Sequence, residues 1–139
     1  MVSVRIISSK IAVIKDYLER IESQKECALE QFLNDRDRQD IVCFNLYHAI
    51  QACMDLASHV ISDEGWGLPS SYREMAEILA QKKVISSELE KSLKEMIGFR
   101  NRLAHEYGKI DFEQVYRIMQ NHLPDIEKFI DAIRSFAKL

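Results

Sequence analysis

The residues best suited to chemistry lie at positions 96–109, where the chain reads Met-Ile-Gly-Phe-Arg-Asn-Arg-Leu-Ala-His-Glu-Tyr-Gly-Lys. An arginine side chain such as Arg100 binds anionic oxygens through paired N–H donors. A histidine side chain such as His105 gains and loses a proton near neutral pH. Together, the two residues could hold an anionic group and transfer protons beside it.

Arg100 falls in the middle of an apolar helix face. Because an arginine keeps its proton and an unpaired buried charge is strongly destabilising, its guanidinium needs a carboxylate or an anionic ligand. The purely structural alternative is a salt bridge to an acid on another helix, such as Asp55. The apolar residues within about 60° of Arg100 on a helical projection are Leu89, Leu93, Met96, Ile97, Leu103, Ala104 and Tyr107.

His105 does not share the direction of Arg100. It lies about 140° around the helix and about 7.5 Å along the axis, while Asn101 stands one turn before it and can hydrogen-bond it. Either the helix loosens before Gly108, or a second copy of the chain brings its own arginine and histidine to a shared cleft. Gly98, near the same side, would let a partner backbone approach closely. Taken alone, His105 could also be an ordinary surface or core histidine.

The segments that must position these residues are helical. With only 4 Gly and 2 Pro in 139 residues, a many-stranded sandwich or barrel is poorly supported. Apolar residues spaced three and four apart predict a first helix over residues 4–33, a connection over 34–40 with Asp35 or Asp37 as a helix cap, and a buried central helix over 41–61.

Further helices are marked by their first residues. Capping-box spacings at 71–74 and 87–90 begin helices that run to about residue 81 and to about 105 or 107. Asp111 caps a last helical region, in which Pro124 predicts a kink or a new start. The sequence thus predicts one all-α domain over residues 1–139, an antiparallel bundle of about five helices.

The central segment carries a narrow polar stripe that needs polar partners, because unpaired buried polar groups cost about 1–3 kcal/mol each. His48, Asp55 and His59 are too few to specify a metal site, so we expect none. The three cysteines, which include no C-x2-C pair, are interpreted as reduced core residues. The stripe consists of Asn45, His48, Gln51, Asp55, His59 and Ser62.

Net charge and hydropathy limit how the chain can contact nucleic acid and membranes. A net charge of −3 argues against binding nucleic acid by bulk attraction, so any such contact must be local. No window approaches the roughly 18 uninterrupted apolar residues of a membrane span, and the N-terminus lacks the features of a signal peptide. We therefore expect a cytoplasmic protein with no membrane partner.

The segment Arg100–Tyr107 matches the pattern R-x4-H-x-Y and, with residues 96–99 before it, resembles the HepT toxins of the HEPN superfamily. Similarity to that family extends to residues 49–57 and 69–74 and to the Ile110-Asp111 step, and so covers most of the chain. The resemblance implies an all-α HEPN-type bundle, a homodimer whose paired motifs line one cleft, and metal-independent ribonuclease activity without a cofactor.

The resemblance also implies roles for single residues. Arg100 would clamp the scissile phosphate, Asn101 would orient the imidazole or the phosphate, and His105 would transfer protons at the ribose 2′-hydroxyl or the leaving oxygen. Tyr107 would be the residue to which an MntA-like nucleotidyltransferase antitoxin transfers AMP. Arg102 and Lys109, with Arg117 as a further candidate, would provide the little basic surface available for RNA, either tRNA or mRNA, so we expect weak or narrowly selective cleavage.

Two other functions remain open at this point. The chain could be a non-catalytic subunit that holds a nucleotide or substrate for a nucleotidyltransferase, in which case Arg100 and His105 would bind a phosphate without cutting. It could also be a helical dimerisation module with an incidental motif.

Overall fold

A computed structural model describes residues 3–139, and within them the chain is entirely helical. Seven α-helices and one short 3₁₀ turn follow one another with short connections. They are α1 (Val4–Glu22), α2 (Leu29–Leu33), α3 (Arg36–Glu64), α4 (Tyr72–Gln81), α5 (Ser87–His105), η1 (Tyr107–Lys109), α6 (Phe112–Asn121) and α7 (Leu123–Ala137).

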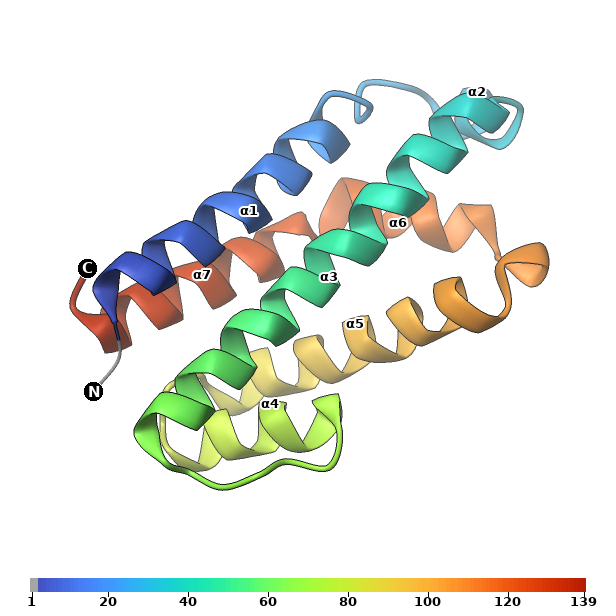
Figure 1. Ribbon diagram of the computed structural model, residues 1–139. Helices are drawn as coiled ribbons and strands as arrows, with labels where there is room; N and C mark the ends of the chain where they lie inside the picture. The colour runs from blue at the N-terminus through green and yellow to red at the C-terminus, as the bar shows by residue number, and fades with distance from the viewer. Residues whose placement is uncertain (1–2) are drawn as a thin grey trace.

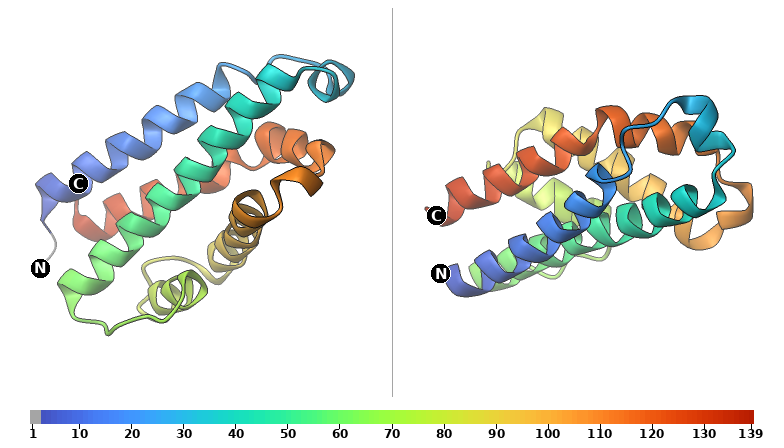
Figure 2. Two further views of the ribbon diagram at one scale, coloured as in Figure 1. Left: turned by 45° about the vertical axis from the view of Figure 1, so that its right-hand side comes forward. Right: turned by 90° about the horizontal axis from the view of Figure 1, so that it is seen from above.

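Helix α3 is the axis of the molecule and packs against every other α-helix. Figure 1 shows α3 crossing the middle of the bundle, with α1 along one side of it and α4 and α5 along the other. The start of α1 lies beside the end of α7, and both views of Figure 2 show the same neighbourhood. The predicted all-α bundle with a buried central helix is therefore confirmed.

The predicted single helix over residues 4–33 is wrong. Helix α1 ends at Glu22, where the Ser23 hydroxyl donates a hydrogen bond to the Arg20 carbonyl at 2.6 Å, and the chain turns before α2. Phe32 on α2 is nonetheless fully buried, in the same core as Ile21 of α1. The apolar spacing continues through the turn because α1 and α2 pack into the same core, although they are separate helices.

Helix starts follow the predicted caps, with two shifts. Asp35 caps α3 by accepting from the Arg38 amide at 3.0 Å, so the predicted connection over 34–40 is shorter and the polar residues after Asp35 form the exposed first turn of a helix. Ser71 caps α4 as predicted, whereas Ser86, one residue before the predicted Ser87, caps α5. Asp111 caps α6 as predicted.

Pro124 lies in the first turn of α7 and so marks a new helix start, one of the two outcomes predicted for it. Helices α6 and α7 contribute buried apolar residues to the core; both pack against α3, and α7 also packs against α5. None of the helices within residues 3–139 has the length and apolar character needed to cross a membrane.

Candidate functional site

Arg100 is held between two aromatic rings. It projects from the second half of α5, half-buried, with its guanidinium carbon 4.8 Å from the centre of the Tyr47 ring and 5.4 Å from the centre of the Tyr72 ring. Its Nη2 donates a hydrogen bond to the Tyr47 hydroxyl at 2.9 Å. We call Tyr47 of α3 and Tyr72 of α4 the aromatic clamp.

No carboxylate neutralises this guanidinium. Within residues 3–139, no acidic oxygen lies within 4.0 Å of Arg100, and Asp55 is exposed and accepts from the Gln51 amide at 3.2 Å. The salt bridge to Asp55 considered from the sequence is therefore wrong. Ring faces attract a cation by about 0.5–2 kcal/mol without cancelling its charge. Arg100 is stabilised in place and remains available to an anion.

The hydrogen bonds of the Arg100 guanidinium also indicate that it is available to an anion. Its Nε is buried and has no hydrogen-bond partner among the described residues, whereas Nη1 donates to the Asn101 side-chain oxygen at 2.9 Å. A buried unpaired donor is costly unless a ligand meets it. Arg100 and Asn101 line an open cleft of about 500 Å³ between the start of α4 and α5.

Arg73 is a cation of this cleft that the sequence analysis missed. It lies on α4 and lines the same cleft as Arg100. Its Nη2 would lie 3.6 Å from a Cβ placed on Gly98, and Arg102 Nη1 would lie 3.9 Å from the same point. Gly98 thus borders two guanidinium groups of its own chain, both at the ends of exposed side chains. Arg73 lies within the 71–74 segment, which predicted only the start of a helix and a likeness to the family.

His105 lies apart from Arg100 in the same chain. It is the last residue of α5, is exposed, and has no side-chain hydrogen bond or ion pair within residues 3–139. The predicted hydrogen bond between Asn101 and His105 is absent, and the Asn101 side-chain oxygen accepts from Arg100. Helix α5 stays regular through His105, so the predicted loosening before Gly108 does not bring the two side chains together.

Tyr107 turns back from η1 towards α3. Its hydroxyl donates a 2.5 Å hydrogen bond to Asp40 Oδ1, and its ring meets Phe112 edge-on. Partial burial and the Asp40 carboxylate both raise the pKa of the Tyr107 phenol, burial being the larger cause. The phenol is therefore a neutral hydroxyl at physiological pH.

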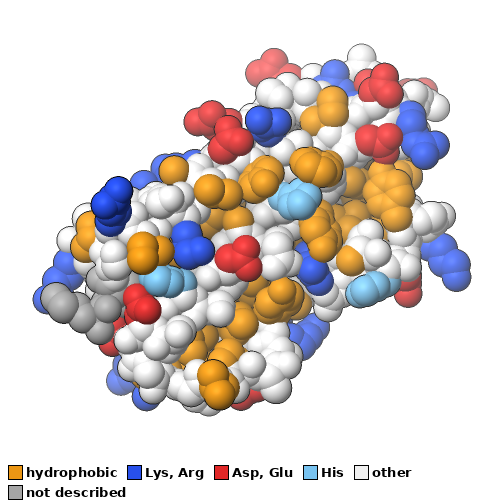
Figure 3. Space-filling view, in the orientation of Figure 1, with side chains coloured by type: hydrophobic (Ala, Val, Ile, Leu, Met, Phe, Trp, Pro, Cys, Tyr) orange, Lys and Arg blue, Asp and Glu red, His pale blue; other side chains and the backbone are white. Residues whose placement is uncertain are grey.

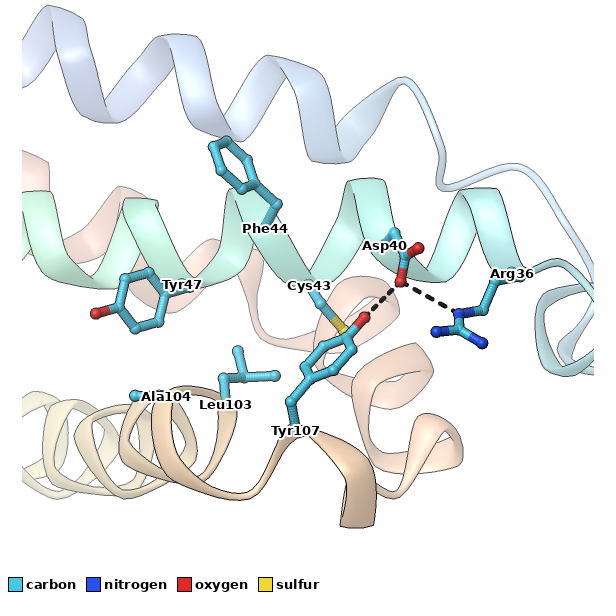
Figure 4. A pocket seen from close by; sticks show the side chains of 8 residues that line it. All are labelled: Arg36, Asp40, Cys43, Phe44, Tyr47, Leu103, Ala104 and Tyr107. Carbon is cyan, nitrogen blue, oxygen red and sulfur yellow. Dashed lines mark hydrogen bonds and ion pairs between the residues drawn. The ribbon is translucent and has the colours of Figure 1, made fainter.

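A cavity of about 550 Å³ opens beside Tyr107 (Figure 4). We call it the Tyr107 pocket. On its α3 side, Arg36 Nε lies 3.7 Å from Asp40 Oδ1, and burial raises the pKa of the Cys43 thiol to about 12. Arg36 and Asp40 were not predicted from the sequence, since neither belongs to the motif. The pocket is lined by Arg36, Asp40, Cys43, Phe44, Tyr47, Leu103, Ala104 and Tyr107.

An apolar patch adjoins the site. Ile41 and Phe44 on α3 are 41% and 57% exposed, and Phe44 also lines the Tyr107 pocket. Figure 3 shows hydrophobic side chains gathered along the middle of this face, over α3. Of the remaining basic candidates, Arg102 and Lys109 lie near the end of α5 and are exposed, whereas Arg117 lies on α6 and pairs with Glu113 at 3.0 Å.

Part of the polar stripe of α3 is paired with other side chains, although Asn45 Oδ1 and Gln51 Oε1 are buried without a hydrogen-bond partner among the described residues. His48 stacks on Tyr17 with the ring centres 5.5 Å apart, and His59 pairs with Asp63 at 3.1 Å. Gln51 donates to the Tyr72 hydroxyl at 2.9 Å and so supports the aromatic clamp. Among residues 3–139, no group of three or more potential ligands could hold a metal ion.

Comparison with known proteins agrees with this arrangement. A family model described as ribonuclease HepT-like matches residues 14–133. The chain belongs to the HepT-like ribonuclease family. Within this family, the mRNA nuclease HepT of Shewanella oneidensis is 38% identical over 130 residues, covering 94% of this chain and 97% of that protein. The tRNA nuclease HepT of Aphanizomenon flos-aquae is 28% identical over 131 residues, covering 94% and 89%.

A solved structure of a HepT-like relative also superposes well. The tri-AMPylated HEPN toxin of Shewanella oneidensis, in complex with an MNT antitoxin, matches with a TM-score of 0.86 and 38% identity, covering 94% of this chain and 97% of that one. The resemblance inferred from the R-x4-H-x-Y segment, and the HEPN-type fold it implied, are confirmed.

Proposed function

We propose that this chain is the toxin of a toxin–antitoxin pair and cleaves RNA, either tRNA or mRNA, as a metal-independent endoribonuclease in the cytoplasm, where a ribonuclease meets cellular RNA. The single observation that carries this proposal is the uncompensated guanidinium of Arg100, fixed by two rings in an open cleft. Membership of the HepT-like family and its nuclease relatives support the same activity.

The reaction follows from the side chains of the motif. Arg100 holds the scissile phosphate and stabilises the charge that builds up on its oxygens in the transition state. His105 takes the proton from the ribose 2′-hydroxyl or returns one to the leaving 5′-oxygen. Asn101 keeps Arg100 aligned through their 2.9 Å hydrogen bond. Attack by the 2′-oxygen leaves a 2′,3′-cyclic phosphate and a 5′-hydroxyl.

We further propose that the active cleft forms between two copies of the chain. Within one chain, Arg100 is half-buried in the cleft beside α4 while His105 is exposed at the end of α5. A symmetric dimer presents both motifs to one cleft, and the apolar patch at Ile41 and Phe44 offers the surface on which such a dimer would pack. The two copies of His105 can then divide the acid and base roles.

RNA binding in this proposal is local. Arg102 and Lys109 extend from the exposed end of α5, and Arg73 adds a third cation beside Arg100. The chain as a whole is acidic, with a net charge of −3. Binding should therefore be modest and restricted to RNAs that fit the cleft.

Tyr107 is the proposed site of neutralisation. A nucleotidyltransferase antitoxin of the MntA type would transfer AMP to its hydroxyl, as the AMPylated state of the Shewanella oneidensis toxin suggests. Each added phosphate carries negative charge, which would repel an RNA phosphate approaching the same end of α5.

Incubation with total tRNA in a buffer containing EDTA tests the enzymatic proposal. Wild-type protein should cleave and leave 2′,3′-cyclic phosphate ends, while His105→Ala should lose about 10²-fold or more, the usual contribution of a general acid or base. His122→Ala, at another exposed histidine, is the matched control. Equal activity of wild type and His105→Ala, or a 3′-hydroxyl product, would contradict the proposal; binding without cleavage would favour the non-catalytic subunit.

A further inference from the structure

The hydrogen bond between Tyr107 and Asp40 joins two segments 67 residues apart, at the atom where a modification would begin. The Tyr107 hydroxyl lies 2.5 Å from Asp40 Oδ1, and both side chains face the Tyr107 pocket (Figure 4). Neither is locked in the core, because the Tyr107 residue is 38% exposed and the Asp40 side chain is 51% exposed. An incoming reagent can therefore reach the hydroxyl while the carboxylate stays in contact with it.

We propose that Asp40 is the general base for nucleotidyl transfer to Tyr107, so that the protein being modified supplies a catalytic residue of its own modification. This inference rests on the proposed function, in which Tyr107 accepts AMP. The co-substrate is a nucleoside triphosphate, ATP for AMP transfer, delivered by the antitoxin.

The step balances with the residues present. The Tyr107 oxygen forms a bond to the α-phosphorus, and the bond from that phosphorus to the bridging oxygen of the β-phosphate breaks. Pyrophosphate leaves with the bonding electron pair, and the phenolic proton passes to Asp40 Oδ1. A neutral phenol is a weak nucleophile, so a base already hydrogen-bonded to it lowers the barrier to this attack.

Other groups in the pocket cannot take this proton. Cys43 remains a neutral thiol, since burial raises its pKa to about 12. Arg36 has no accessible neutral form. The other lining residues are Phe44, Tyr47, Leu103 and Ala104, so Asp40 supplies the only carboxylate among the described residues that line the pocket.

Arg36 and the size of the pocket fit the other reactant. A carboxylate beside the nucleophile would repel a triphosphate, but Arg36 Nε lies 3.7 Å from Asp40 and its side chain is 79% exposed. It is free to turn towards the phosphates and offset that repulsion. The cavity of about 550 Å³ is within the range of ordinary small-molecule sites.

The test compares rates of AMP incorporation. Wild type, Asp40→Asn, Asp40→Glu and Asp37→Asn are incubated with the cognate nucleotidyltransferase, ATP and Mg²⁺, and incorporation is followed by intact mass. Asp40→Asn keeps an oxygen acceptor but loses the base, so its rate should fall about 10²-fold or more, with partial recovery in Asp40→Glu. Asp37→Asn, an exposed residue of the same helix with the same loss of charge, should match wild type.

A pH profile separates a base from a structural contact. Without the base, the Asp40→Asn rate should rise about tenfold per pH unit, as the tyrosinate fraction grows, while the wild-type rate stays level around neutral pH. Arg36, Asp40, Cys43, Tyr47 and Tyr107 are the titratable groups that line the pocket, and Arg20 lines a second cavity that also borders Asp40. Equal or faster modification of Asp40→Asn, with an unchanged profile, would overturn the inference and make the contact a shield of Tyr107.

Failure of the underlying function gives a different result. If wild-type protein takes up no AMP while the partner is active on another substrate, the proposed antitoxin mechanism itself fails, and the role of Asp40 fails with it. If wild type is modified at Tyr107 and Asp40→Asn is modified equally well, only the inference about Asp40 fails.

Discussion

The Tyr47 hydroxyl accepts a hydrogen bond from Arg100 at 2.9 Å while the Tyr47 ring lies 4.8 Å from the same guanidinium. One side chain thus both orients the cation and stabilises it. A carboxylate would have fixed Arg100 more strongly, but it would also have neutralised the charge that a phosphate needs. An aromatic partner fixes the direction of the guanidinium and preserves its charge.

Substitution of Tyr47 should therefore lower activity in two steps. Tyr47→Phe loses only the hydrogen bond, and we expect cleavage to fall a few-fold. Tyr47→Leu also loses the ring, worth about 0.5–2 kcal/mol as a cation–π partner, and should fall a further 2- to 30-fold. RNA cleavage rates check this, with Tyr17→Leu, another half-buried tyrosine that packs against α3, as the control. Activity of Tyr47→Leu equal to that of Tyr17→Leu would show that the clamp does not position Arg100.

The exposed apolar patch should hold the dimer together. Phe44→Asp places a charge in the middle of the patch, and we expect a monomer that has lost RNA cleavage, because the cleft needs both copies. Light scattering coupled to gel filtration measures the mass. Leu68→Asp, at a residue 98% exposed in the connection between α3 and α4, should stay dimeric. A dimeric, active Phe44→Asp protein would place the interface elsewhere.

Helix α2 should be anchored by a single side chain. Phe32→Ala removes a fully buried ring and should destabilise the fold by about 3–5 kcal/mol. Leu33→Ala, the neighbouring residue at 44% exposure, should change stability by about 0.5 kcal/mol or less. Urea unfolding of both variants measures the difference. Similar unfolding midpoints would mean that α2 does not contribute to the core.

Asp35 should make stability depend on pH in the acidic range. Its hydrogen bond from the Arg38 backbone amide, the largest cause, lowers the pKa of its carboxyl in the folded state. A lowered folded-state pKa stabilises the fold at pH values above the unfolded value of about 3.9, and this contribution disappears as pH falls through the folded-state pKa.

Asp35→Asn provides the comparison, because asparagine also caps helices but does not titrate. Wild type should unfold at a higher temperature than Asp35→Asn at pH 7, and the two should converge as the pH falls through the lowered folded-state pKa of Asp35. A difference in melting temperature that persists unchanged at low pH would rule out the Asp35 carboxylate as its source.

Features set by neighbouring residues could be predicted from the sequence. The caps at Asp35, Ser71 and Asp111 and the new helix at Pro124 depend on contacts within one turn. The break after Glu22 was hidden, since Phe32 continues the apolar spacing into the same core.

The motif was predictable in part. Its apolar setting around Arg100 was visible in the sequence, but its true partners were not, because Tyr47 and Tyr72 come from other helices. Asp40 and Arg73 were missed for the same reason: the contact of Asp40 with Tyr107 spans 67 residues, and Arg73 meets the motif only through the packing of α4 on α5. No pattern in one sequence identifies which exposed side chains meet across helices.

A mixed dimer tests the central claim, that Arg100 of one chain and His105 of its partner act in one cleft. Arg100→Ala and His105→Ala chains carrying different tags are co-expressed, and the doubly tagged dimer is purified and assayed on tRNA beside a doubly tagged wild-type dimer. Each parent homodimer lacks one group entirely and should be inactive. The mixed dimer retains one arginine and one histidine on different chains, so it should cleave at a rate below wild type and clearly above both parents. A mixed dimer as inactive as its parents, beside an active tagged wild type, would contradict the shared cleft.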